Sequence, residues 1–292
     1  MTKSPDAAAT ASDETLATTI RGKLGSLTPT ERRAAHVLLS NYPFAGLETV
    51  AQFASRAGIS APSILRFIAR LGFGAYADFQ RHLKDELEAQ LQSPLMKQAP
   101  EQANASPLSA FAAAVVANIT HSFEAMAPTE FDAILAIITD TKRRLHVVGG
   151  RLTEAVALYT VRHLRVIRPD VTLVEGQAAT WRDQVIDFGK RDVLIVFDIR
   201  RYQDDVVLLA QEATERGATI VLFTDQWLSP IARFARHVIS ARTGVPSNWD
   251  SNAAILAIIE ALMSAATKTL WDLSKARMEA LEILRKNSQR PG

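Results

Sequence analysis

Between Ser60 and Gly72 the sequence places two arginines and a hydroxyl where they could contact a DNA duplex. Ser63, Arg66 and Arg70 follow one another at positions i, i+3 and i+7, so a helix would carry them on one face. Arginine side chains reach phosphates or guanine edges in a duplex groove, and a serine hydroxyl can contact either. An ordinary amphipathic helix with a solvated basic face has the same pattern, so this segment alone leaves both interpretations open.

The helix that would position these side chains has recognisable ends and an apolar face. Ser60 is a good N-cap, Pro62 is tolerated in a first turn, and Gly72 stands where a helix would stop. A preceding helix over about residues 47–56, followed by a tight turn in which Gly58 can adopt a left-handed conformation, completes a predicted helix-turn-helix. The turn favours the nucleic-acid interpretation. The predicted apolar face consists of Ile64, Phe67, Ile68 and Leu71.

The region around this motif is basic, although the whole chain is nearly neutral. The net charge is only +2, but from Arg21 to Lys84 the chain carries nine Lys or Arg residues against three Asp or Glu. A small domain with such a surplus is attracted to phosphates. A capping-box pattern over 28–31 opens an earlier helix that runs through about Tyr42. The predicted DNA-binding residues are Ser60, Ser63, Arg66 and Arg70, with Arg32, Arg33, Arg56 and Lys84 as candidate phosphate contacts.

The second half of the chain alternates short apolar runs with helical segments. The runs lie at about 145–148, 171–174, 192–197, 219–224 and 237–240. Continuous apolar strands separated by helices predict a parallel sheet covered on both faces, an α/β three-layer doubly wound fold. Helices are expected over about 108–126, 128–139, 150–167, 178–188, 203–216 and 229–235, with one long helix over 251–287.

Ligands of such sheets bind beyond the carboxyl ends of the strands. Three arginines at these ends, Arg151, Arg200 and Arg201, would favour an anionic ligand, because a guanidinium pairs with carboxylate or phosphate through two hydrogen bonds. They could equally be structural and pair with Asp198, with Asp204 or with a neighbouring subunit. Thr224 and Ser229 also fit roles as turn or cap residues. The full set of candidate ligand-binding residues is Gly149, Gly150, Arg151, Thr153, Asp198, Arg200, Arg201, Gln203, Thr224 and Ser229.

The N-terminal motifs resemble a known family. L-T-P-T-E-R-R near the start, followed by A-x-x-A-G-I-S-A-P-S-I-L-R-F-I-A-R-L-G-F-G, is similar to the DNA-binding domain of RpiR-type bacterial transcriptional regulators over about residues 20–87. The resemblance implies an all-α helix-turn-helix domain that binds a double-stranded DNA operator. Ala61 and Pro62 stand where the family often has more polar residues.

The second half resembles the SIS (sugar isomerase) domain, the usual companion of that DNA-binding domain. The residues that carry the likeness are D-V-L-I-V-F-D at 192–198, R-G-A-T-I-V-L-F-T-D at 216–225 and S-P-I-A-R-F-A at 229–235. The resemblance implies a sugar-phosphate ligand held by Ser, Thr and Gly in the loops after the first and third strands. Here those loops read G-G-R-L-T and D-I-R-R-Y-Q, so the hydroxyls are largely absent and a sugar acid is also considered.

The sequence therefore predicts four segments. A disordered tail is expected over 1–17, a helix-turn-helix DNA-binding domain over 18–90, a linker over 91–107, and an SIS-like ligand-binding domain over 108–292. The linker prediction rests on its prolines among Gln, Ala, Ser and Asn.

Other kinds of chemistry have little support in the sequence. It contains no cysteine, its six histidines lack metal-ligand spacing, and the common phosphate-loop, serine-nucleophile and zinc-protease motifs are missing. We therefore expect no catalytic residue, no metal and no cofactor. No apolar run reaches the length of a membrane span and no signal pattern opens the chain, so we expect a cytoplasmic protein without a membrane partner.

Together these observations predict a transcriptional regulator of carbohydrate metabolism whose activity is modulated by a small anionic, sugar-type ligand. One helix-turn-helix reads only a short half-site, so a homodimer or tetramer is expected. Two alternatives are an SIS-type sugar-phosphate isomerase with a helical appendage, and a ligand-free scaffold in which Asp198 and Arg200 pair and close the site. The apolar residues predicted to support self-association lie on the long terminal helix: Ile255, Leu256, Ile258, Ile259 and Leu262.

Overall fold

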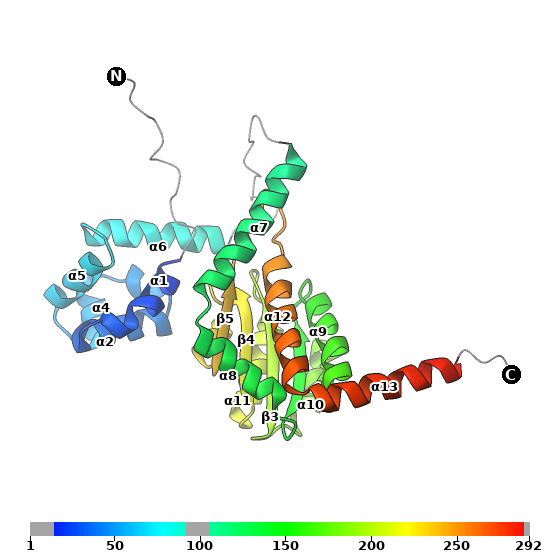
Figure 1. Ribbon diagram of the computed structural model, residues 1–292. Helices are drawn as coiled ribbons and strands as arrows, with labels where there is room; N and C mark the ends of the chain where they lie inside the picture. The colour runs from blue at the N-terminus through cyan, green and yellow to red at the C-terminus, as the bar shows by residue number, and fades with distance from the viewer. Residues whose placement is uncertain (1–14, 92–105, 289–292) are drawn as a thin grey trace. The chain divides into compact units, whose positions relative to one another are not determined.

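The computed structural model describes residues 15–91 and 106–288 of the 292-residue chain. The chain divides into two compact units, Met1–Gln92 and Ser93–Gly292 (Figure 1). Most of the predicted tail and of the predicted linker lies outside the described residues. The tail prediction is wrong at its last residues: a helix begins at Leu16, because Leu16 and Ala17 are buried in the core of the N-terminal unit.

The N-terminal unit is helical throughout its described residues. Its elements are α1 (Leu16–Lys23), the 3-10 helix η1 (Leu24–Ser26), α2 (Pro29–Ser40), α3 (Phe44–Leu47), α4 (Val50–Ala57), α5 (Ala61–Arg70) and α6 (Tyr76–Leu91). The capping box at the start of α2 is confirmed, with Thr28 and Glu31 bonded to each other in both directions. The helix predicted over 47–56 is α4, which begins three residues later than predicted because Thr49 and Gln52 form a second capping box at its start. The short helix α3 before it was not predicted.

One apolar core holds these helices around α5. Ile64 and Phe67 of α5 are fully buried, as predicted, against Phe53 of α4 and Phe79 of α6. Gly58 closes α4 with φ of 61°, the left-handed conformation that its turn requires. The buried face of α5 is therefore fixed on both sides, and its opposite face is left to solvent.

The C-terminal unit is an α/β fold. Its elements are α7 (Pro107–Ala125), α8 (Pro128–Thr139), β1 (Arg144–Gly149), α9 (Glu154–Ile167), β2 (Val171–Leu173), α10 (Ala178–Val185), β3 (Asp192–Asp198), α11 (Asp204–Glu215), β4 (Thr219–Asp225), the 3-10 helix η2 (Pro230–Arg233), β5 (His237–Ala241), α12 (Ala253–Thr269) and α13 (Trp271–Ser288). The five predicted strands are confirmed to within two residues at each end.

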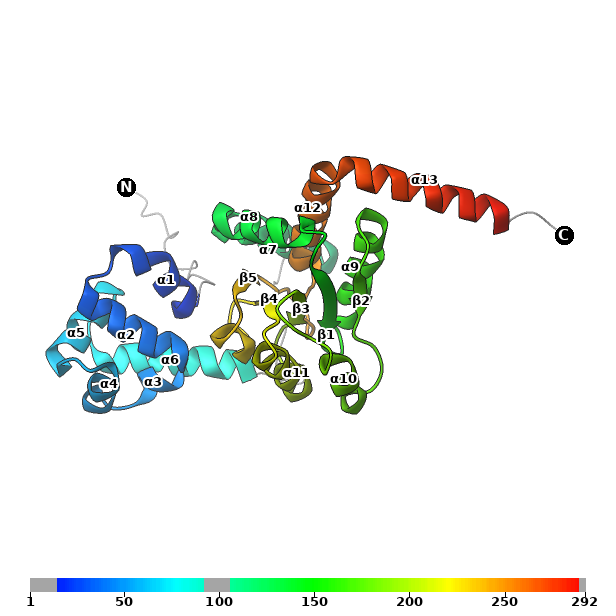
Figure 2. The same cartoon turned by 90° about the horizontal axis from the view of Figure 1, so that it is seen from below.

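The strands form one parallel sheet in the order β2-β1-β3-β4-β5. Helices α8, α9 and α12 pack on one face of the sheet, and α10 and α11 pack on the other (Figure 2). β3 is buried along its whole length because both of its faces are covered. The predicted three-layer doubly wound fold is confirmed. The chain reverses its direction of travel across the sheet between β1 and β3, the position at which such folds bind ligands.

The prediction of one long helix over 251–287 is wrong. Its residues form α12 and α13, which meet at Leu270 with a bend of 99°. No glycine or proline marks the break. It follows from tertiary contacts, because Ser274 and Arg277 of α13 donate hydrogen bonds to the carbonyls of Ile167 and Arg165 at the end of α9.

The prediction that this helix offers an apolar surface for self-association is also wrong. Four of the five predicted residues, Ile255, Ile258, Ile259 and Leu262 of α12, are at most 1% exposed and belong to the core on one face of the sheet, and Leu256 is half-buried. Their apolar stripe is used inside the subunit, because the sheet needs a covering helix on that face.

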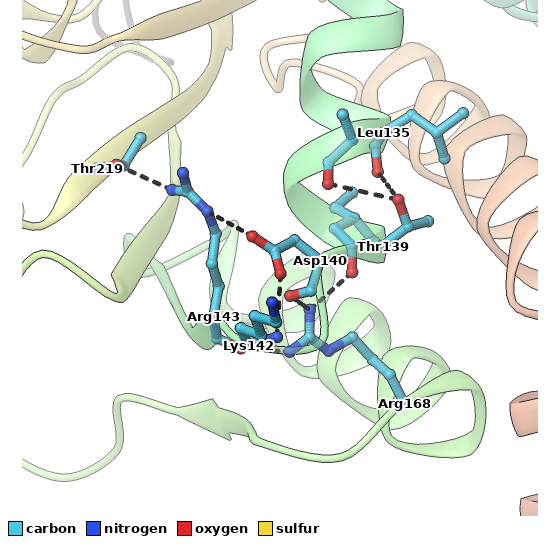
Figure 3. A network of polar contacts seen from close by, with 9 residues as sticks. Leu135, Thr139, Asp140, Lys142, Arg143, Arg168 and Thr219 are labelled. Atoms are coloured by element: carbon cyan, nitrogen blue, oxygen red, sulfur yellow. Dashed lines mark hydrogen bonds and ion pairs between the residues drawn. The ribbon is translucent and has the colours of Figure 1, made fainter.

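A buried arginine fastens the end of α9 to the loop before β1 (Figure 3). The Arg168 guanidinium is fully buried and donates to the carbonyls of Ile138 at 2.7 Å, of Asp140 at 3.0 Å and of Arg143. Its Nε donates to the carbonyl of Pro169 at 3.0 Å. This one side chain therefore bonds to four carbonyls at the joint between α8, α9 and β1, one of which, that of Asp140, also accepts from the Arg143 N–H at 3.1 Å.

Within the described residues, no single helix has the length and apolar character of a membrane span. The pair α12 and α13 meets those criteria only when the two helices are counted together across their bend.

Candidate nucleic-acid interface and strand-edge site

The exposed face of α5 differs from the predicted one at Ser63. This residue is 8% exposed, because it lies beside Ile64 and Phe67 on the edge of the buried face. Its Oγ lies 2.9 Å from the Ser60 Oγ and accepts a hydrogen bond from Arg66 Nη2 at 2.9 Å. Ser63 thus orients Arg66 and does not itself project from the helix.

Ser60 and Arg66 remain on the exposed side of the motif. Ser60 has the backbone conformation of an N-cap, but its side chain forms no capping hydrogen bond and bonds to Ser63 instead. Arg66 therefore stands at the end of a short polar chain that fixes its direction. Both arginines predicted to enter the groove are exposed, and the side chain of Arg66 bonds within α5 itself.

Arg70 is tied to the neighbouring helix α2. Its Nη1 lies 3.1 Å from Glu31 Oε2, and its Nη2 donates to the Ser26 carbonyl at 2.6 Å. Hydrogen bonds from Thr28 and the charge of Arg70 hold the pKa of Glu31 below its usual value, against a raising effect of desolvation. The spacing of the sequence could not reveal this pairing, which joins residues 39 positions apart.

The predicted phosphate contacts are spread around the N-terminal unit. Arg32, Arg33 and Lys84 are exposed, and Arg32 also donates to the Leu27 carbonyl at 3.2 Å. Arg56 forms an ion pair with Glu48, through a bond from its Nε at 3.2 Å and a second from its Nη2. These cations surround the helix-turn-helix without forming one cluster.

In the C-terminal unit, the sheet register brings the predicted ligand residues to one edge. Gly149 lies opposite Phe197, and Asp198 opposite Thr224. The carboxyl ends of β1, β3 and β4 are therefore side by side, as the apolar runs predicted. Most polar groups at this edge bond to one another.

The three predicted hydroxyls are internal. Thr153 Oγ1 donates to the Phe197 carbonyl at 2.6 Å and accepts from the Gly150 N–H at 2.8 Å. Thr224 Oγ1 donates to the Asp198 carbonyl at 2.6 Å and accepts from the Ser229 N–H at 3.0 Å. For Thr224 and Ser229, the alternative interpretation as turn or cap residues therefore describes the contacts better than ligand binding does. All three hydroxyl residues are at most 2% exposed: Thr153, Thr224 and Ser229.

Two buried carboxyl groups lie beneath this edge. Burial raises the pKa of Asp198 to about 7, and its Oδ2 accepts a hydrogen bond from Ser229 Oγ at 2.5 Å. Burial likewise raises the pKa of Asp225 to about 6. Asp225 accepts from the Tyr202 hydroxyl and from the Arg200 N–H, both at 2.6 Å. Both carboxyls therefore hold the loops after β3 and β4 together.

Arg200 is part of this internal network, which corrects its prediction as a ligand contact. Its guanidinium bonds to both carboxylate oxygens of Asp250, at 2.7 and 2.8 Å, and lies 4.1 Å from the centre of the Trp227 ring. Its side chain is 5% exposed. The prediction left an internal partner open, but Asp250 was missed because it lies 50 residues further along the chain.

Arg151 and Arg201 keep their side chains exposed. Neither guanidinium forms a hydrogen bond or ion pair with any residue in the described ranges 15–91 and 106–288. The Gln203 Oε1 accepts a hydrogen bond from the Arg151 N–H, so the loop after β1 is fastened to the loop after β3. The two arginines therefore flank the position at which the strand order reverses.

Two known domains match the chain over most of its length. Residues 14–90 match the helix-turn-helix domain of the rpiR family, and residues 137–265 match the SIS domain. The chain belongs to the RpiR family of transcriptional regulators. As the sequence predicted, it is a DNA-binding regulator with an SIS-type C-terminal domain.

Similar proteins are consistent with both domains of this RpiR regulator. An uncharacterized HTH-type transcriptional regulator from the aarA 3′ region of Providencia stuartii is 24% identical over 211 residues, which cover 70% of this chain and 74% of the relative. The sugar isomerase domain of an RpiR transcription factor from Sphaerobacter thermophilus is 22% identical, covers 60% of this chain and 97% of its own, and has a TM-score of 0.56.

A structure of the Vibrio vulnificus NanR protein, complexed with ManNAc-6P, extends over both domains. It is 14% identical, covers 92% of this chain and 98% of its own, and has a TM-score of 0.53. At these identities the two solved structures show that the RpiR regulator shares their fold.

Proposed function

We propose that this regulator binds a small anionic, sugar-type ligand at the strand edge, and that the bound ligand changes its affinity for DNA. The observation that carries the proposal is the pair of exposed guanidinium groups on Arg151 and Arg201, beside the switch point between β1 and β3. Arginine binds phosphate and carboxylate through paired hydrogen bonds. The ManNAc-6P complex of NanR supports a phosphorylated sugar as the ligand class.

The ligand can be sought by its effect on thermal unfolding. All four tryptophans lie in the C-terminal unit, so their fluorescence follows that unit within the full chain. ManNAc-6P, glucose 6-phosphate and gluconate would be tested at millimolar concentration. We expect at least one of them to raise the midpoint of unfolding by several degrees, because a ligand that binds only the folded state stabilises it.

The arginines are tested by variants in the same measurement. Arg151→Ala combined with Arg201→Ala should remove the stabilisation, whereas Arg162→Ala, which deletes an exposed arginine on α9, should keep it. Retained stabilisation in the double variant would contradict the assigned site. Equal affinity for DNA with and without a stabilising ligand would contradict regulation by that ligand.

We further infer that the strand edge binds its ligand without catalysing a reaction of it. Isomerisation of a sugar needs a positioned acid or base. Asp198, Asp225 and Asp250 at this edge are already bonded to Ser229, to Tyr202 and to Arg200. Incubation of the full chain with the stabilising sugar phosphate should leave the compound unchanged, and turnover would favour the isomerase alternative.

We propose that the regulator is a homodimer that associates through α7. The side chains of this helix that face the rest of its unit include the buried polar residues Asn118 and Ser122, which bond to the Gly244 carbonyl and the Arg242 N–H. Ile119 packs against the core, but four large apolar side chains of α7 are exposed: Leu108 80%, Phe111 41%, Val116 63% and Phe123 36%. Exposed apolar surface of this extent is typical of an interface.

A second copy of the chain is the partner that fits this face. An RpiR-type helix-turn-helix reads one half-site, and α7 directly follows the segment that leads from the DNA-binding unit. Leu108→Glu combined with Val116→Glu should convert a dimer into a 32.0-kDa monomer in analytical ultracentrifugation. Leu208→Glu, at an exposed leucine on α11, is the matched control and should remain dimeric. A dimer in the double variant would exclude α7 as the interface.

A further inference from the structure

The exposed face of α5 is mostly apolar, which is unusual for a solvated helix. Its exposed residues are Pro62, Leu65, Arg66, Ala69 and Arg70, and the first four adjoin one another at helical spacing. Leu65 is 45% exposed, although Ile64, Phe67 and Ile68 beside it in sequence are buried. Between Pro62 and Ala69, Arg66 is the one exposed side chain that could bind a phosphate.

We propose that Leu65 reads the 5-methyl group of a thymine in the major groove, next to a guanine read by Arg66. The proposal rests on DNA binding through α5 and adds the base class that this helix selects. In a helix-turn-helix, the N-terminal residues of the second helix contact base edges. Thymine is the base that presents a methyl group in the major groove, and apolar side chains contact it there.

The local contacts support this assignment. Ser63 accepts a hydrogen bond from Arg66 at 2.9 Å and so turns the guanidinium to one side of the exposed face. Arg70 is held against α2 by Glu31 and Ser26. Leu65 and Ala69 are therefore left as the apolar part of the face beside Arg66, and they adjoin one another at a spacing of four residues.

The experiment compares thymine with deoxyuridine, which differs only by the methyl group. Preferred duplexes are first selected from a random pool with the full-length protein. Each thymine of the selected half-site is then replaced in turn by deoxyuridine, and the dissociation constant is measured. We expect one position at which the replacement weakens binding by about fourfold per half-site, the factor given by burial of one methyl-sized group.

The same replacement is then measured with variants. In Leu65→Ala the deoxyuridine effect at that position should disappear, because the two changes remove the same contact. In Leu208→Ala, which shortens an exposed leucine outside the DNA-binding unit, the effect should persist. Since Leu65 is largely exposed, Leu65→Ala should fold, and circular dichroism checks this.

Three results would overturn the proposal in different ways. Full affinity for every deoxyuridine duplex would exclude a thymine contact while leaving DNA binding intact. An unchanged deoxyuridine effect in Leu65→Ala would assign the contact to another residue. If the wild-type protein selected no preferred sequence from the pool, α5 would not recognise a base sequence at all, and the assignment of Leu65 would be wrong as well.

Discussion

Arg66→Ala is expected to weaken binding to the preferred DNA sequence by about 5- to 150-fold per half-site. That range corresponds to the roughly 1–3 kcal/mol by which one paired arginine–guanine contact discriminates between bases. Arg66 is exposed on α5 and is held in position by Ser63. Dissociation constants measured by fluorescence anisotropy at moderate ionic strength test the expectation, and the loss should be larger for the preferred sequence than for random DNA.

Arg70→Ala is the matched comparison on the same helix. It deletes a guanidinium that is paired with Glu31 and the Ser26 carbonyl, so we expect it to change DNA affinity much less. An exposed ion pair of this kind contributes only about 0.2–1 kcal/mol to stability, so the variant should remain folded. An equal loss of affinity in both variants would mean that Arg70 leaves Glu31 when DNA binds.

Arg168→Met is expected to destabilise the C-terminal unit by about 3–5 kcal/mol. The change removes the donor to the carbonyls of Ile138, Asp140 and Arg143 in a buried site. The Asp140 carbonyl keeps the Arg143 N–H, and each acceptor left without a donor costs about 1–3 kcal/mol. Urea unfolding of the full chain, followed by tryptophan fluorescence, measures the free energy of unfolding of this unit alone, because the N-terminal unit contains no tryptophan.

Two further variants keep this test decisive. Arg168→Lys retains the charge but lacks the planar fork of donors, so we expect an intermediate loss even if Arg168→Met does not fold. Arg143→Ala removes a partly exposed side chain of the same network and should cost less than about 1 kcal/mol. If Arg168→Met unfolded at the same urea concentration as the wild type, loss of this donor would leave no carbonyl unsatisfied, which would contradict the assigned role of Arg168.

The sheet and its edge could be predicted from the sequence because their signals are local. Short apolar runs such as 192–197 are bounded by polar residues and glycine, and parallel pairing of such runs forces their ends to meet. The turn at Gly58 and the capping box at Thr28 likewise depend on a few adjacent residues. These elements therefore agree with the structure to within a few residues.

The predictions were wrong where residues distant in the sequence determine whether a side chain is buried or paired. Helical spacing placed Ser63 beside Arg66 and Arg70. The buried face of α5 is wide enough to include Ser63, and its width depends on the helices that pack against it. Arg200 has a side chain suited to binding an anionic ligand, and its internal partner Asp250 is brought to it only by the fold. The spacing of the apolar residues of α12 is the same for a helix that covers a sheet and for a helix that contacts a second subunit. In the fold they pack against the sheet.

Gly149 limits how ligand recognition at the strand edge could evolve. A side chain at this position would place its Cβ within 2.5 Å of the Thr153 backbone, which leaves no room for serine. A Cβ at Gly150 would lie 2.6 Å from Gln203 Oε1. A single substitution at Gly149 therefore offers no route to a hydroxyl-lined pocket, whereas a substitution at Gly150 requires only that the end of the flexible Gln203 side chain move.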